Sequence, residues 1–402
     1  MQTFTGKEYL KIDIANNFGL DKKLFHERIE WFDSNKFRLK ELVNEAEEPA
    51  LFMAGMFAYE DMIQRKPTGY TVALDACSSG LQIMAAITGC RETAKNTGLV
   101  DPDVRPDVYT TGHEVMATMM DIGQYPRSVL KDAIMTYFYG SEARPKAAFG
   151  EGTKELDVFF QVMKIIAPAA FVLRNSLIEL WQPNVLKHSW VLPDNFHVEI
   201  KTMVEVEEEV HVKQLGIVFN QKRKVNKGQE KGLHLAANTI HSIDAFVVRE
   251  MNRRCNYNKD LVLSLLALPC TGQGLNRDVD HALSALINCY KQSKLLSVRC
   301  IDYIDTHNYG MLPEEMREEL ESILNGMLKY KPFHLLTVHD CFRCHPNYMN
   351  WVRLNYIKIF MQLADSDILQ DIVSQIRGVP TVVNKVTNDL SKYIAKSNYM
   401  LS

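Results

Sequence analysis

The sequence predicts a mostly helical α/β fold of the α+β kind, in which a few short strands interrupt long helical regions. Apolar residues recur at helical spacing over 25–51, over most of 81–180 and again after residue 233. Two short β-prone segments, Tyr70–Leu74 and Leu335–Val338, stand outside this pattern, and each leads to an aspartate. We therefore expect helices packed around neighbouring short strands that end at Asp75 and Asp340.

A third β-prone segment, Val198–Phe219, alternates between polar and apolar residues, which predicts a hairpin that turns around Glu207–Lys213. Basic residues run through and beyond it, at Lys213, Lys222, Arg223, Lys224, Lys227 and Lys231. Glutamates between residues 205 and 209 offset this charge. Because such a run is more often a solvated face than a nucleic-acid contact, it assigns no function by itself.

The composition is that of a globular protein large enough for two or three domains, with 402 residues of which 46% are hydrophobic. The net charge of −3 is less basic than is typical of a nucleic-acid enzyme, although such an enzyme needs only a locally positive channel. The cysteines are scattered, the first residues lack a signal-peptide pattern, and the longest apolar run, Leu261–Cys270, is too short for a membrane span. We expect a cytoplasmic protein with free thiols and no membrane contact.

The first aspartate, Asp75, follows a strand and precedes a tight turn that leads into a helix. Ser78 or Ser79 is placed to cap that helix, and Gly80 follows. A carboxylate beside a glycine and a helix N-terminus suits metal binding and the close approach of a substrate backbone. An aspartate that only caps the helix is the competing interpretation.

The second aspartate stands in the pair His339-Asp340. A His-Asp pair is expected about once by chance in a chain of this length, so its weight comes from the strand before it and from Asp75. Two carboxylates from neighbouring strands can hold two Mg²⁺ ions, which activate an attacking 3′ oxygen and stabilise a leaving pyrophosphate. We interpret His339 as a core histidine rather than a catalytic one.

The most specific pattern is a helix that begins at Pro126 and stops at Gly140. Arg127, Lys131 and Tyr139 lie on one stripe of that helix, because they are spaced by multiples of four residues. An arginine fork and a lysine one turn apart can grip a triphosphate, with the tyrosine further along toward the sugar. The pattern has a chance frequency on the order of 0.003 in a chain of this length, so a merely solvated basic face is the weaker interpretation.

These three sites, in this order, resemble motifs A, B and C of the phage and mitochondrial single-subunit DNA-directed RNA polymerases. The run Asp75–Gln82 is similar to Asp-Gly-Ser-Cys-Ser-Gly-Ile-Gln in those enzymes, whereas family A DNA polymerases resemble Asp-Tyr-Ser-Gln-x-Glu. Cys341 stands where the DNA enzymes carry Glu, and Tyr139-Gly140 is similar to the sugar-sensing pair of the RNA enzymes. A family A-like DNA polymerase and a non-catalytic subunit of a transcription complex are the alternatives.

The resemblance implies a right-hand polymerase fold, with an antiparallel palm and helical fingers, and a DNA-directed RNA polymerase activity. The implied ligands of two Mg²⁺ ions are Asp75, Asp340 and the carbonyl of Ala76, which replaces a family glycine. The residues implied to bind the NTP are Arg127, Lys131, Tyr139 and His241, with Lys131 as proton donor to the pyrophosphate and the last two as ribose sensors. Those implied to lie against nucleic acid are Ser79, Gly80, Gln82 and Tyr109.

The resemblance also implies a division of the chain. We expect a palm segment with a helical module over 1–66, the palm with motif A over 67–92, and fingers with a candidate specificity hairpin over 93–245. A helical insertion follows over 246–330, and the palm with motif C and C-terminal helices over 331–402.

Two family features are missing from the sequence: an N-terminal domain with a thumb, and a Gly-Arg pair. We expect a second polypeptide to supply them, in a heterodimer like the split, two-subunit phage polymerases. The other expected partners are template DNA, nascent RNA and NTPs.

Overall fold

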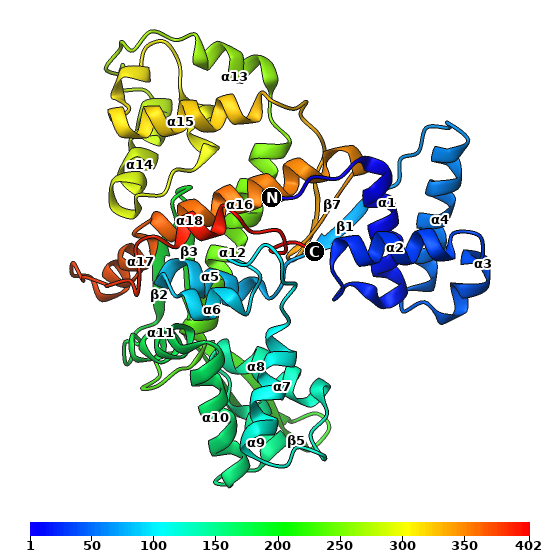
Figure 1. The fold of residues 1–402 in the computed structure, drawn as a ribbon. Coiled ribbons are helices and arrows are strands. Elements are labelled where there is room, and N and C mark those ends of the chain that lie inside the picture. Colours follow the sequence, from blue (N-terminus) through cyan, green and yellow to red (C-terminus); the bar gives the residue numbers. More distant parts are fainter.

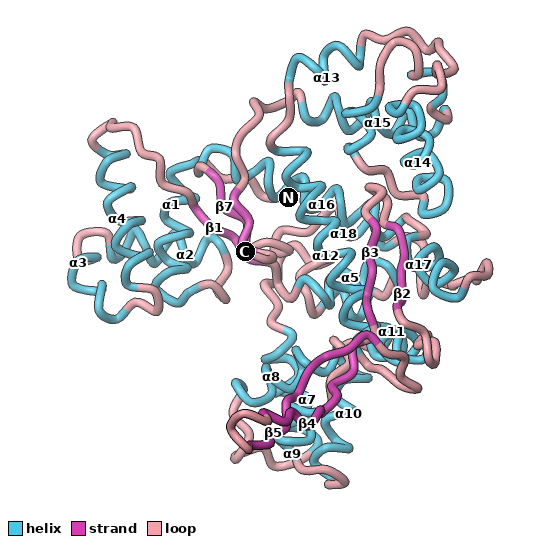
Figure 2. Tube along the Cα trace, turned by 180° about the vertical axis from the view of Figure 1, so that it is seen from behind, coloured by secondary structure: helices cyan, strands magenta, loops and turns pink.

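The computed structural model describes residues 1–402 as a mostly helical α/β structure with three small antiparallel sheets (Figures 1 and 2). The strands are β1 (Val72–Asp75), β2 (Lys187–Val191), β3 (His197–Lys201), β4 (Met203–Val212), β5 (Ile217–Asn226), β6 (Leu336–Val338) and β7 (Cys341–Cys344). The predicted combination of many helices with few, short strands is confirmed.

The helices before the first long hairpin are α1 (Gly6–Ala15), α2 (Phe25–Asn35), α3 (Leu39–Leu42), α4 (Pro49–Ile63), α5 (Ser79–Thr88), α6 (Arg91–Lys95), α7 (Val108–Met119), α8 (Arg127–Phe138), α9 (Ala143–Phe149), α10 (Lys154–Ile166) and α11 (Pro168–Glu179). Those after it are α12 (His234–Cys255), α13 (Lys259–Leu266), α14 (Asp278–Ser293), α15 (Glu314–Met327), α16 (Met349–Asp365), α17 (Ile368–Arg377) and α18 (Leu390–Ile394).

The sheet that positions the two aspartates has the order β1-β7-β6, so that β7 is its central strand. The sequence predicted β1 and β6 but not β7. Strands β6 and β7 form a hairpin whose turn is His339-Asp340, because Val338 pairs with Cys341. His339 has φ 54°, and such a left-handed residue is what a two-residue hairpin turn requires.

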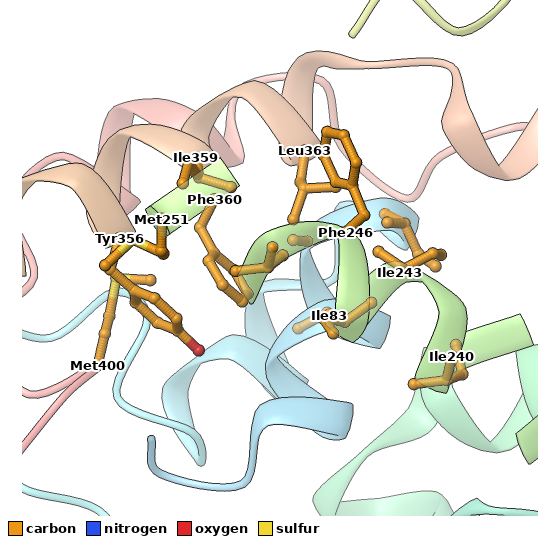
Figure 3. Close-up of a cluster of buried hydrophobic side chains, with 14 of the residues drawn as sticks. Ile83, Ile240, Ile243, Phe246, Met251, Tyr356, Ile359, Phe360, Leu363 and Met400 are labelled. Carbon is orange, nitrogen blue, oxygen red and sulfur yellow. The ribbon is translucent and has the colours of Figure 1, made fainter. Parts of the chain in front are cut away.

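Helices α5, α12 and α16 pack together beside this sheet and form the centre of the largest hydrophobic core (Figure 3). Ile83 of α5 faces Ile243 and Phe246 of α12, and α16 contributes Phe360 to the same cluster. Met400, close to the end of the chain, packs into this cluster as well. The core therefore fixes α5 and α12 relative to the strands that carry the aspartates.

Three groups of helices extend outward from this centre (Figure 1). Helices α1 to α4 lie together on one side and have a small hydrophobic cluster of their own, which includes Phe32 and Phe52. Helices α7 to α10 form a second group, and α13 to α15 form a third on the opposite side of the centre.

The long hairpin is made by β4 and β5, and it turns at residues 213–216. The sequence prediction of a turn around Glu207–Lys213 was wrong. The glutamates extend the strand because they face basic residues on the other strand: Glu205 pairs with Lys222 at 3.2 Å, and Glu208 pairs with Arg223. These cross-strand pairs account for Lys222 and Arg223 as part of a solvated face.

No single helix is both long and apolar enough to cross a membrane. Helices α10 and α11 meet those limits only when joined, and they are bent by 111° where they meet.

Candidate active site

The fold brings Asp75 and Asp340 to the same end of the central sheet. Asp75 is the last residue of β1 and pairs with Cys341, while the backbone N–H of Ala76 donates to the carbonyl of Asp340 at 3.3 Å. Burial and the negative charge of Asp75 raise the pKa of Asp340. The charge of Asp75 therefore reaches Asp340, as expected of two carboxylates at the same end of a sheet.

The last residues of the chain hold the backbone of this aspartate pair in place. The N–H of Ser402 donates to the carbonyl of Asp75 at 2.9 Å, and the N–H of Cys77 donates to the carbonyl of Met400 at 3.2 Å. Ala76 and Leu401 form an antiparallel bridge. Since the segment runs beside β1 like an added strand, it limits the motion of Asp75.

The oxygen donors at this place fit Mg²⁺, which prefers carboxylates and carbonyls. Asp75 is exposed and Asp340 is half-buried, and each would lose the repulsion of the other on binding a divalent cation. The replacement of the family glycine by Ala76 causes no strain, because Ala76 does not have a positive φ. Its carbonyl oxygen accepts one hydrogen bond, from Ser78 at 2.9 Å, which leaves its second lone pair free.

A cavity of about 340 Å³ opens beside Asp340, and we call it the site cavity. The polar residues that line it are Ser78, Ser79, Tyr109, Tyr139, His241, Asp244, His339 and Asp340. They come from the turn before α5, from α7, α8 and α12, and from the β6–β7 turn. Five segments far apart in the sequence thus meet at one hollow.

Tyr139 and His241, the predicted ribose sensors, lie side by side in the site cavity, with ring centroids 4.5 Å apart. Tyr139 ends α8, and burial together with the nearby Asp244 raises the pKa of its hydroxyl, which therefore stays protonated. His241 lies at the exposed rim, yet the protein atoms around it lower its pKa. A neutral imidazole can donate and accept a hydrogen bond at once.

The predicted phosphate-binding residues follow one stripe of α8. Lys131 is exposed, and its ammonium lies 5.9 Å from the ring centre of Tyr109. Arg127 is not free: it pairs with Asp107, and its Nε donates to the hydroxyl of Thr110 at 2.8 Å. Asp107 also caps α7, so Arg127 connects the two helices.

The structure corrects two predicted roles at the start of α5. Gln82 does not face nucleic acid: it is fully buried, and its amide binds the carbonyls of Thr97 and Met400 and the hydroxyl of Tyr356. Ser78 occupies the capping position of α5 in a left-handed conformation, but its side chain makes no capping hydrogen bond. Ser79 and Gly80 are buried, although both line the site cavity.

Sequence reasoning gave no role to Asp244, which lies one helical turn after His241. The hydroxyl of Ser79 donates to its Oδ2 at 3.4 Å. Burial and the charge of Asp340 raise the pKa of Asp244 to about 6. The spacing from His241 was the one local signal that both side chains share a helix face.

Part of the sequence matches a known protein family. A model of the family described as DNA-dependent RNA polymerase matches residues 3–149, a segment that contains Asp75, Arg127, Lys131 and Tyr139. Over this segment, the chain is similar to DNA-dependent RNA polymerases. Among RNA polymerases, a protein of Neurospora crassa named "Probable DNA-directed RNA polymerase" is 22% identical over 412 residues, which cover 91% of this chain and 40% of that protein.

A second relative, the mitochondrial DNA-directed RNA polymerase of Neurospora crassa, is 27% identical over 164 residues, which cover 34% of this chain and 12% of that protein. The chain therefore spans well under half the length of the RNA polymerases that it matches.

Proposed function

We propose that this chain is the catalytic part of a DNA-directed RNA polymerase and adds nucleotides from NTPs to the 3′-OH of RNA on a DNA template. The observation that carries the proposal is the meeting of Asp75 and Asp340 beside a cavity that also holds Tyr139 and His241. Under this proposal, segments 67–92 and 331–402 form the palm, and 93–245 forms the fingers.

Asp75, Asp340 and the carbonyl of Ala76 are the residues that would hold two Mg²⁺ ions. When bound, such ions supply positive charge at the attacking 3′ oxygen and at the leaving pyrophosphate. The hydrogen bonds from Ala76 to Asp340 and from Ser402 to Asp75 keep the donors oriented before substrate arrives. Orientation of this kind lowers the cost of reaching the reactive geometry.

Arg127 and Lys131 bind the triphosphate, Arg127 through its planar fork and Lys131 as a point charge that also gives a proton to the pyrophosphate. Their position on one stripe of α8 supports this role, because successive turns of the helix follow successive phosphates. The pair between Arg127 and Asp107 implies that phosphate competes with a carboxylate for this arginine.

Tyr139 and His241 select ribose over deoxyribose. The two rings are in contact, and the protonated hydroxyl of Tyr139 beside a neutral His241 offers both a donor and an acceptor to a sugar hydroxyl. A site built to bind a hydroxyl discriminates against the analogue that lacks it, because its own polar groups are left unpaired.

Template and nascent RNA lie next to the wall of the site cavity that Ser79, Gly80 and Tyr109 line. The ring of Tyr109 is half-buried and faces Lys131, so that it offers a stacking surface next to a positive charge.

The second polypeptide stays a prediction, for which α1 to α4 offer a surface to test. Phe37, Met53 and Phe57 are exposed apolar side chains on that group of helices, and such patches mark protein contacts. Phe57→Glu should release a co-purifying subunit, whereas Phe57→Leu should retain it. A chain that is monomeric and processive on its own would contradict the prediction.

Primer extension tests the proposed function. An RNA primer annealed to a DNA template is offered NTPs or dNTPs with Mg²⁺, and we expect extension with NTPs in strong preference. Preference for dNTPs would identify a DNA polymerase, and extension no greater than that of Asp340→Asn would leave the non-catalytic alternative.

A further inference from the structure

We infer that Asp244 is a specificity-determining residue, whose carboxylate accepts a hydrogen bond from a hydroxyl of the incoming nucleotide's ribose. This inference rests on the proposed function and adds a third side chain to the pair Tyr139 and His241.

Asp244 lines the site cavity. Asp244 lies one turn of α12 beyond His241, and both side chains line the site cavity together with Tyr139 and Asp340. Asp244 is close enough to both Tyr139 and Asp340 for their charges to interact, so it borders the space that the ribose sensors and Asp340 share.

The carboxylate of Asp244 makes one hydrogen bond within the protein. Its Oδ2 accepts one long hydrogen bond, from the hydroxyl of Ser79 at 3.4 Å. Its Oδ1 accepts none from the protein, and it is not among the buried polar atoms that are sealed from solvent. One oxygen is thus held by Ser79 while the other is open to the cavity.

Charge decides what that open oxygen can bind. An ionised carboxylate only accepts hydrogen bonds, so its partner must be a donor. A phosphate oxygen cannot be that partner, because it is negatively charged and has no hydrogen to donate to the carboxylate of Asp244. A sugar hydroxyl is neutral and donates, and it is the donor that an NTP brings to this part of the site.

The experiment compares three substrates that differ by one hydroxyl each. Single-nucleotide addition to an RNA primer on a DNA template is measured with an NTP, its 2′-deoxy analogue and its 3′-deoxy analogue. For Asp244→Ala, we expect kcat/KM to fall roughly tenfold for the NTP and to change little for the analogue that lacks the bound hydroxyl. The analogue that escapes the loss identifies the hydroxyl as 2′ or 3′.

Two further variants separate this role from a structural one. Ser79→Ala removes the hydrogen bond to Asp244 but leaves the carboxylate. The wild-type ratio of kcat/KM between the NTP and its deoxy analogues should therefore persist, even if all three values fall. Asp371→Ala removes another partly buried carboxyl, in the groove between α14 and α17 and away from the site, and should affect all three substrates equally and slightly.

An equal fall in kcat/KM for all three substrates in Asp244→Ala would overturn the inference. So would a fall that is reversed by a higher Mg²⁺ concentration. If wild-type protein adds no nucleotide, the proposed function itself fails. Activity of wild type with no difference between substrates in the variant refutes Asp244 alone.

Discussion

Gly80 lies against the hydroxyl of Tyr139 so closely that a Cβ atom on Gly80 would be 2.3 Å from that oxygen. The start of α5 and the end of α8 therefore meet with no space for one more carbon. Gly80 has no positive φ, so the reason for glycine here is proximity rather than backbone conformation. The same Tyr139 ring lies beside His241, with the ring centroids 4.5 Å apart.

Gly80→Ala should displace the ring of Tyr139 and reduce nucleotide addition at least tenfold, with a loss of folding stability of about 1–3 kcal/mol from overpacking. Gly69→Ala is the matched control, because a Cβ at Gly69 meets nothing within 4 Å. Single-turnover addition rates and thermal unfolding of both variants check this. Equal activity of the two variants would show that the contact does not matter for catalysis.

Asp75→Asn and Asp340→Asn should each abolish nucleotide addition while template binding stays nearly intact, because each removes a charge that the metal ions need. Asp103→Asn, at an exposed acid outside the site cavity, serves as control. Addition rates and template affinity are measured in parallel. More than a few per cent of wild-type activity in either variant would refute the assignment of that aspartate.

Tyr139→Phe should weaken the preference for NTPs over dNTPs by about 1–3 kcal/mol, since the variant loses a hydroxyl that hydrogen-bonds to ribose. The ratio of kcat/KM for the two substrates is the measurement. Tyr137→Phe is a suitable control, because Tyr137 is buried on the same helix but outside the site cavity. An unchanged ratio in Tyr139→Phe would mean that another residue discriminates.

Asp107→Asn should lower the KM for NTP up to about fivefold, the range expected for a partly exposed ion pair. Asparagine still caps α7, so the change removes the competition for Arg127 and leaves the helix start intact. Asp389→Asn breaks a similar pair with Arg91 and should leave the KM unchanged. A raised KM in Asp107→Asn would show that Asp107 orients Arg127 for the phosphates instead.

Gln82→Ala should destabilise the fold by about 2 kcal/mol or more, because buried partners at Thr97, Met400 and Tyr356 lose their hydrogen bonds. Template affinity per folded molecule should not change. Gln64→Ala, at an exposed glutamine, should change neither the stability of the fold nor the template affinity. A stable Gln82→Ala variant with weakened template binding would restore the nucleic-acid role that the sequence indicated.

Local sequence patterns predicted the elements that carry the site better than the pairing between them. The strands before Asp75 and Asp340 were found because short β-prone runs stood out from helical surroundings. Strand β7 was missed because Cys341–Cys344 is not a run of β-prone residues, although it pairs with a strand on each side. Such pairing depends on residues far apart in the chain.

In the candidate site, too, features encoded by local sequence could be predicted, whereas contacts between distant segments could not. Asp75 ends a strand, and Tyr139 and Asp340 line one cavity; each of the three stands in a motif with its own local structure. Gln82 was misassigned because the C-terminal residues fold back over α5, a contact that no local pattern encodes. Asp244 was overlooked because a single aspartate on a helix does not reveal which side chains other elements bring to it.

We propose, as the central claim, that this chain adds ribonucleotides whose bases pair with the bases of a DNA template. The most direct test purifies the chain with the polypeptides that accompany it in its native host and offers each of the four NTPs singly. The RNA primer is annealed to templates that differ only in the next base. The account predicts that the nucleotide added follows the templating base and that Asp340→Asn abolishes addition. Addition that ignores the template, or that persists in Asp340→Asn, would contradict the account.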